Sequence, residues 1–134
     1  MLLQPKKTKH VKLQKGRLKK FEFKKTQLVF GDVGLKAKCS GIITARQIEA
    51  TRRAIVRKLE RKGKLWIKIF PNQPITAKAN ESRMGKGKGN ISHWAVKVSR
   101  GCVLFEICGI PISSAKTALI SGGKKLPLKT KIIV

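Results

Sequence analysis

The strongest periodic pattern in the chain lies between residues 44 and 63, where apolar side chains recur every three or four positions. This spacing places one apolar stripe along a helix, so we expect a helix with a buried face there. Thr44 and Gln47 have the spacing of a capping box, which predicts where the helix begins, and Gly63 predicts where it ends. The face expected to turn to the core holds Ala45, Ile48, Ile55, Val56 and Leu59.

Alternation of polar and apolar residues predicts strands elsewhere in the chain. We place them at 27–30, 35–39, 64–71, 93–98, 102–108 and 129–134, with the apolar segment 41–44 following the second. A three-residue turn joins 93–98 to 102–108, which favours an antiparallel hairpin. A second, shorter helix should begin at Ser113 and end at Gly122–Gly123.

Two segments show no such periodicity. Residues 71–92 hold two prolines and a glycine run and are predicted to form an extended loop, and long loops inside compact domains tend to be functional. Residues 1–26 carry ten cations and one carboxylate and are predicted to form a basic arm with little core. The order of elements favours an α+β fold, a two-layer sandwich of an antiparallel or mixed sheet with two helices, in a single domain over residues 1–134.

Net charge points to the class of partner. Lysine and arginine total 32 against 6 aspartates and glutamates, which gives a net charge of +26. Such a body repels itself unless a polyanion neutralises it, and nucleic acid or an anionic membrane surface would do so. No apolar run approaches the roughly 18 residues that a membrane-spanning helix needs. Because aromatic residues are 5% of the chain and no zinc-finger, zipper or RRM pattern is present, we expect recognition of the backbone and shape of a folded RNA.

The glycine run RMGKGKGN at 83–90 lacks the features of an enzyme's phosphate loop. No serine or threonine follows its Gly-Lys pairs, and a strand rather than a helix is predicted after it. The carboxylates are unpaired along the chain, and His10 and His93 stand alone, so we expect no catalytic activity, no metal and no cofactor. The odd number of cysteines argues against a disulfide framework, and we expect small hydrophobic residues at Cys39, Cys102 and Cys108.

Three groups of residues are candidates for contact with RNA. Glycines in the loop would let backbone amides approach a phosphate closely. The helix arginines suit bidentate hydrogen bonds to phosphate. The arm would be attracted to any polyanion. The competing interpretations are a flexible linker for the loop and a merely solvated face for the helix, where Arg52 falls inside the apolar arc. The candidates are Lys6, Lys7, Lys9, Lys12, Lys15 and Arg17 in the arm, Arg46, Arg52, Arg53, Arg57 and Arg61 along the helix, and Arg83, Met84, Gly85, Lys86, Gly87, Lys88 and Gly89 in the loop.

Several of these segments also carry a family resemblance. The stretches LLQPKKTKHVKLQKGR, TARQIEATRRAIVRKLERKGKLWIKIFPNQPIT, ESRMGKGKGN, VLFEICGIP and KLPLKTKIIV occur in this order over essentially the whole chain. Together they resemble bacterial-type large-subunit ribosomal protein sixteen, a universal family with an archaeal and eukaryotic branch. The resemblance implies a structural constituent of the large ribosomal subunit that binds rRNA near the aminoacyl-tRNA site and the peptidyl-transferase centre, and that supports subunit assembly and tRNA positioning.

The same resemblance implies partners and residue roles. The partners would be large-subunit rRNA, tRNA in the aminoacyl site and neighbouring ribosomal proteins, with no membrane. Residues 83–88 match the family's loop that points toward the peptidyl-transferase centre, and Arg46, Arg52 and Arg53 match its helix. The rRNA-binding arm of the family is matched by Pro5, Lys6, Lys7, Lys15, Gly16 and Arg17.

The motifs are most similar to mitochondrially encoded forms of the family. Lysine outnumbers arginine and isoleucine is abundant, as often accompanies AT-rich coding sequence, and no import extension precedes Leu2. We therefore expect an organelle-encoded protein of the mitochondrial matrix, with a plastid or the bacterial cytoplasm as the alternative. The alternative function, from a different class, is a general DNA-packaging protein of the nucleoid.

Overall fold

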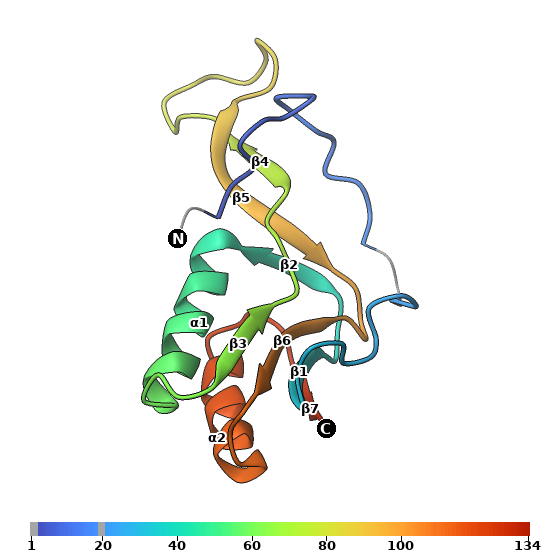
Figure 1. The fold of residues 1–134 in the computed structure, drawn as a ribbon. Helices are drawn as coiled ribbons and strands as arrows, with labels where there is room; N and C mark the ends of the chain where they lie inside the picture. The colour runs from blue at the N-terminus through green and yellow to red at the C-terminus, as the bar shows by residue number, and fades with distance from the viewer. Residues whose placement is uncertain (1–2, 19–20) are drawn as a thin grey trace.

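The protein folds into two antiparallel sheets and two helices, which confirms the α+β class (Figure 1). The computed structural model describes residues 3–18 and 21–134. One sheet has the strand order β3-β6-β1-β7 and the other the order β2-β5-β4. In chain order the elements are β1 (Val33–Ala37), β2 (Gly41–Thr44), α1 (Ala45–Lys58), β3 (Lys64–Ile67), β4 (Gln73–Ala77), β5 (Asn90–Val98), β6 (Val103–Cys108), α2 (Ile112–Gly123) and β7 (Thr130–Ile133).

The core lies between the two helices and the four-stranded sheet. Helix α2 packs against β1 and β7, and α1 packs against α2, β2 and β5. Leu35 and Phe105 from the sheet meet Ile48, Ile55 and Leu119 from the helices, and all five side chains are buried. The β4–β5 pair projects away from this body and carries the glycine loop at its tip, with the N-terminal arm alongside it (Figure 1). The fold therefore separates a packed body from a cationic projection.

Helix α1 begins where the capping box predicts. Thr44 Oγ1 accepts a hydrogen bond from the Gln47 amide, and Gln47 Oε1 accepts one from the Thr44 amide. The helix ends at Lys58, earlier than Gly63 suggests, because Glu60 and Arg61 adopt left-handed φ values of 52° and 64°. Gly63, with φ 72°, belongs instead to the turn that enters β3.

The prediction that residues 93–98 and 102–108 form a hairpin is wrong, because β5 and β6 lie in different sheets. Five of the six residues of β6 are buried, so this strand needs cover on both faces and neighbours on both edges, which β1 and β3 supply. At Gly101 the chain turns with φ 92°, and the Gly101 amide donates to the Ala37 carbonyl at 2.8 Å. The turn thus directs the chain from the three-stranded sheet into the four-stranded sheet.

Two further expectations are corrected. The stretch expected to be an extended loop at 71–92 contains β4 and the start of β5, so its irregular part shrinks to 78–89. Helix α2 begins at Ile112 after Pro111 with no side-chain cap, so Ser113 does not cap it. The prediction that α2 ends at Gly122–Gly123 is confirmed, since Gly123 is its last residue and Lys124 its C-cap. Both glycines are buried, and a Cβ at Gly122 would stand 2.5 Å from Ile55, so this glycine also permits close packing of α2 on α1.

Residues 27–30 form no strand but a loop across the outer face of the four-stranded sheet. The Glu106 carboxylate, fully buried on β6, accepts hydrogen bonds from the amides of Val29, Phe30 and Gly31 at 3.3, 2.7 and 3.1 Å. Its other oxygen lies 3.6 Å from the Lys68 ammonium and has no hydrogen-bond partner among the described residues. One buried carboxylate therefore fastens this loop to the sheet.

Replacing Glu106 with alanine should lower the free energy of unfolding by roughly 3–5 kcal/mol, because it removes the counter-charge of the poorly exposed Lys68 ammonium. Three loop amides would also lose their acceptor. Urea unfolding measures the difference, and the exposed Glu81→Ala change should stay within about 0.5 kcal/mol as a control. A Glu106→Ala chain as stable as the control would contradict the role of this carboxylate.

Candidate nucleic-acid interface

The outer face of α1 presents the arginines that the helical period predicts. Arg46, Arg53 and Arg57 are exposed on the helix, and the Arg53 side chain is 74% exposed. Arg61 is also exposed, but it follows the end of the helix and stands in the left-handed turn toward β3. The helical period therefore places three of these four arginines correctly and misplaces the fourth.

Arg52, the residue that disturbs the stripe, is ion-paired. Its guanidinium donates two hydrogen bonds of 2.8 Å to Glu49, one to each carboxylate oxygen, and Arg53 Nε donates a third at 3.0 Å. The hydrogen bond from Arg52 is the main reason that the pKa of Glu49 falls from 4.5 to about 2, and Glu49 in turn raises the pKa of Arg52. This pair fixes Arg52 along the helix and partly neutralises it.

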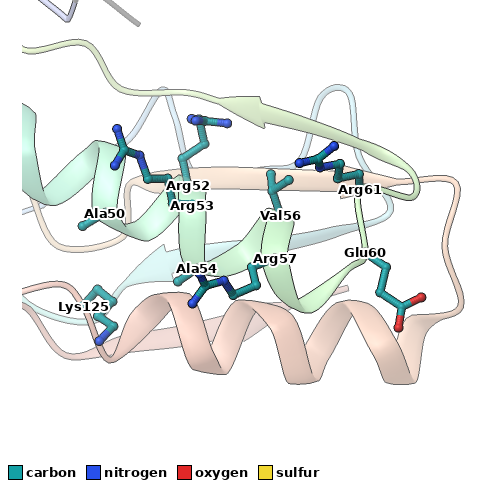
Figure 2. A pocket seen from close by; sticks show the side chains of 9 residues that line it. All are labelled: Ala50, Arg52, Arg53, Ala54, Val56, Arg57, Glu60, Arg61 and Lys125. Atoms are coloured by element: carbon teal, nitrogen blue, oxygen red, sulfur yellow. The ribbon is translucent and has the colours of Figure 1, made fainter.

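The other helix arginines have no such partner. Within the described residues, the side chains of Arg46, Arg57 and Arg61 make no hydrogen bond or ion pair. Figure 2 shows Arg57 directed toward the space between α1 and α2, with Lys125 beyond the end of α2. A groove of about 880 Å³ follows α1 and reaches Lys125, and Glu60 is the one carboxylate among the described residues that line it. Unpaired guanidinium groups on an open groove are available to phosphate oxygens.

The N-terminal arm joins the helix to the glycine loop. Leu3 is buried and lies against α1 beside Ala45 and Arg46, so the arm contributes to the core that its composition did not predict. Further along, Lys12 Nζ donates to the Lys88 carbonyl at 2.8 Å. Lys88 Nζ donates to the Leu13 carbonyl, and Gln73 Nε2 donates to the carbonyl of Lys15 at 3.4 Å. The remaining candidate cations of the arm are exposed: Lys6, Lys7, Lys9, Lys15 and Arg17.

The tip of the β4–β5 projection is a run of left-handed residues. Gly85, Lys86 and Gly87 have φ values of 96°, 52° and 79°, and a Cβ at either glycine would meet no other atom. These glycines therefore serve backbone conformation and not close packing. Gly89 differs, since a Cβ there would lie 2.3 Å from the Ala77 carbonyl oxygen. Arg83, Met84 and Lys88 are exposed, and Met84 is 99% exposed.

The structure thus brings the three candidate groups into contact through the arm, which touches α1 at Leu3 and the loop at Lys12. Sequence reasoning missed Lys125, which follows α2 and lines the groove beside Arg57. The signal for it was weak, because a lysine after a helix is ordinary and only the packing of α2 on α1 brings it near. It also missed Lys64 and Lys68, which lie over aromatic rings.

No catalytic or metal chemistry emerges from the described part of the chain. Residues 3–18 and 21–134 contain no cluster of three metal-binding side chains. The thiols of Cys39, Cys102 and Cys108 are free, and burial raises the pKa of the Cys102 thiol. None of the described helices is both long and apolar enough to cross a membrane.

A basic α+β body with free arginines along a groove defines a nucleic-acid-binding protein. The family model for ribosomal protein L16p/L10e matches residues 5–133. The chain is 51% identical over 132 residues to the large ribosomal subunit protein uL16 of Hyphomonas neptunium, covering 98% of this chain and 96% of that relative. It is 52% identical to the protein of that name from Gluconobacter oxydans, with the same coverage, and 50% identical to that of Caulobacter vibrioides, covering 92% of the relative. The chain belongs to the L16p/L10e family of ribosomal proteins, and it is a structural ribosomal protein and not an enzyme.

Glu49 should make part of the stability depend on pH. Its pKa is about 2 in the folded chain against an ordinary 4.5, so its contribution is complete above pH 4.5 and is lost as the pH falls toward 2. Urea midpoints should fall over this interval and fall less in Glu49→Gln, because glutamine does not titrate. The exposed Glu60→Gln change should keep the wild-type slope, and equal slopes for wild type and Glu49→Gln would contradict this assignment.

Proposed function

We propose that this chain is a structural constituent of the large ribosomal subunit that binds large-subunit rRNA through α1, the arm and the glycine loop. Family membership supports the ribosomal role and the association with rRNA. The observation that carries the choice of surface is the set of unpaired guanidinium groups at Arg46, Arg57 and Arg61. Since 6 carboxylates face 32 cations, only an external polyanion can neutralise most of this charge.

The contacts of α1 divide its arginines by expected role. Arg46, Arg57 and Arg61 bind phosphates directly, since their donors are unused within the described chain. Arg52 and Arg53 share the Glu49 carboxylate, which orients them along the groove and leaves part of their donors for RNA. An internal carboxylate thus orients two arginines of this surface, and the other three have their donors free for phosphate.

The arm and the glycine loop bind as one unit. Lys12 and Lys88 each donate an ammonium hydrogen to the other segment's backbone, so the two segments hold each other beside the projection. Phosphates that approach either lysine replace a neutral carbonyl with a charged acceptor, which makes a stronger hydrogen bond. The arm therefore reaches the loop at Lys12, and its other candidate rRNA residues are exposed: Lys6, Lys7, Lys9, Lys15 and Arg17.

We further infer that the loop from Arg83 to Gly89 lies near the aminoacyl-tRNA site and the peptidyl-transferase centre. Its position at the tip of a projection, its exposed cations and its resemblance to the family loop support this. There it would help to position aminoacyl-site tRNA, while other surfaces of the chain contact neighbouring ribosomal proteins. Its support of subunit assembly follows from the rRNA contacts of α1 and the arm.

The proposed setting is the mitochondrial ribosome, with the protein encoded in the organelle. The excess of lysine over arginine and the abundance of isoleucine support this proposal. The relatives reported above are bacterial, so the bacterial cytoplasm and the plastid are the competing settings. Localisation of the tagged chain in its source cell distinguishes the three.

The alternative of a DNA-packaging protein is displaced by the family match. A competition experiment tests whether the chain prefers large-subunit rRNA to duplex DNA. The full chain bound to transcribed large-subunit rRNA should resist competition by an equal mass of duplex DNA. Equal competition by the two nucleic acids would contradict selective binding of rRNA.

Arg57→Gln should weaken binding to large-subunit rRNA and flatten its dependence on salt by about one phosphate equivalent. The reason is that a phosphate contact releases counterions, so its loss lowers the slope of log K against log salt. Lys116→Gln, an exposed cation on α2 outside the groove, is the matched control and should keep the wild-type slope. An Arg57→Gln slope equal to that of the control would show that this face is only solvated.

The double change Gly85→Ala and Gly87→Ala should leave the body folded but slow the accommodation of tRNA in ribosomes that carry it. Alanine is strained at positive φ by about 1–2 kcal/mol per residue, while no neighbouring atom is displaced. Thermal unfolding of the isolated chain checks the body, and a pre-steady-state accommodation assay checks the loop. Gly89→Ala serves as the contrast, because its clash with Ala77 should disturb β4–β5 pairing. If tRNA accommodation is unchanged in the double variant, the loop acts only as a spacer.

A further inference from the structure

Strand β7 is an outer strand of the four-stranded sheet, since it pairs with β1 on one side and with no described strand on the other (Figure 1). The Lys38 amide donates to the Lys129 carbonyl, so Lys129 directs its backbone toward β1. Backbone groups of successive residues in a strand point to alternate edges. Lys131 therefore also faces β1, while Thr130 and Ile132 direct their backbone groups to the open edge. The fold thus leaves a short row of backbone donors and acceptors available for another strand.

An apolar groove of about 600 Å³ lies beside this edge, between β7 and the C-terminal end of α2. Ile120 on α2 is 52% exposed, so part of this hydrocarbon surface has no cover among the described residues. No aromatic ring on which a base could stack is found among the described residues of the lining. The groove therefore suits aliphatic side chains. Its own apolar lining includes Leu35, Ile120, Leu126, Leu128 and Ile132.

The border of the groove is cationic. Lys124 follows α2, and Lys129 and Lys131 lie before and within β7. All three lysines are exposed and form no ion pair, and no described residue of the lining carries a carboxylate. Lysines on an outer strand repel an identical edge, which disfavours a second copy of this chain as the occupant. An acidic strand would find complementary charge at the same place.

We propose that β7 and this groove receive an extended, acidic segment of a neighbouring ribosomal protein, which adds a strand to the sheet. The proposal rests on the proposed function, in which other surfaces contact neighbouring ribosomal proteins, and it assigns one of those surfaces. Main-chain hydrogen bonds to Thr130 and Ile132 supply affinity, and the groove supplies specificity. Side chains of a strand alternate between two faces, so aliphatic residues fill the groove and acidic residues lie beside Lys131.

RNA is the competing occupant, because its phosphates would also be attracted to the lysines. An RNA strand, however, has no alternating amides and carbonyls to pair with the edge of a sheet. It also has no aliphatic side chain for a groove that is lined by leucine and isoleucine. The combination of an open strand, an aliphatic groove and a cationic border therefore favours a peptide.

A peptide of alternating glutamate and valine tests the edge in the full-length chain, and about six residues is the usual length of a strand. Hydrogen exchange of the β7 amides, followed by NMR, is the measurement. The amides of Thr130 and Ile132 should exchange fast in the free chain and slowly in the complex. The Lys131 amide, which faces β1, should exchange slowly in both. Attraction between charges alone would not produce this alternation.

A second peptide separates strand pairing from charge. Methylation of every other backbone nitrogen keeps the glutamates and valines but removes the amides that would pair with the edge. This peptide should leave the exchange of Thr130 and Ile132 unchanged.

Variants of the chain separate the groove from the lysines, with anisotropy of the labelled alternating peptide as the measurement. Ile120→Ser should weaken binding roughly fivefold, because it removes aliphatic surface from the groove. Lys131→Gln should weaken binding about twofold, as expected for an exposed charge pair. The matched controls lie on α2 outside the groove: Ile112→Ser, at a residue that is 47% exposed, and Lys116→Gln. Both controls should bind the peptide as the wild type does, and circular dichroism verifies the fold of each variant.

Several results would overturn the proposal. The first is continued fast exchange of Thr130 and Ile132 with the alternating peptide, or equal slowing by the methylated peptide. The second is equal peptide binding by Ile120→Ser and Ile112→Ser. Slowing of the same two amides by single-stranded RNA would make RNA the occupant. A wild-type dimer in sedimentation that becomes a monomer in Ile120→Ser would make a second copy the occupant.

Binding of transcribed large-subunit rRNA tests the proposed function separately. Ile120→Ser should bind this rRNA as the wild type does, and Arg57→Gln should bind the peptide as the wild type does. If the wild-type chain binds rRNA but not the peptide, only the strand-binding site fails. If it binds the peptide but not rRNA, the proposed function fails, and with it the assignment of the partner to the ribosome.

Discussion

The scarcity of carboxylates is the constraint on which the rest of the structure depends. Six acids face 32 cations, and among the described residues three of the four ion pairs involve two of them, Glu49 and Glu106. Glu106 fastens a loop and faces Lys68 beneath it, and Glu49 holds Arg52 and Arg53 along α1. Most of the other cations among the described residues form no ion pair and are exposed. Binding of a polyanion therefore relieves the repulsion among the cations of the folded chain. RNA stabilises the protein in addition to being its ligand.

Where carboxylates are absent, backbone carbonyls take their place. Lys12, Lys78 and Lys88 donate to carbonyls of the arm and the glycine loop, contacts that hold the projection together without neutralising it. Such bonds are weaker than those to a charged acceptor, so phosphate competes well for the same ammonium groups. In the proposed function, the projection is ordered before it contacts RNA and exchanges these internal hydrogen bonds for bonds to phosphate. The packed body, held by buried apolar side chains and Glu106, need not change when this happens.

The sequence predicts features that depend on contacts between neighbouring residues, and it does not predict those that depend on residues far apart in the chain. The start of α1 can be predicted from four residues alone, because the side chains of Thr44 and Gln47 each accept a hydrogen bond from the other residue's backbone amide. The end of the helix cannot be predicted in this way, because Glu60 and Arg61 adopt conformations that their residue types disfavour. The separation of β5 from β6 depends on strands far away in the chain, and alternation looks the same for a hairpin and for two sheets. The roles of Glu106 and Gly122 likewise require knowing which loop and which helix pack against them.

The position of Arg61 connects these points. A helical period assigns it to the arginine-bearing face of α1, and that face would be one continuous stripe. The left-handed turn after Lys58 removes Arg61 from the helix and sets it among the residues that line the groove beside Arg57. The period of a helix predicts the face of a side chain only as far as the helix extends, so the end of α1 decides which surface Arg61 joins. A change of backbone conformation at two residues thus alters the shape of the cationic surface without altering its composition.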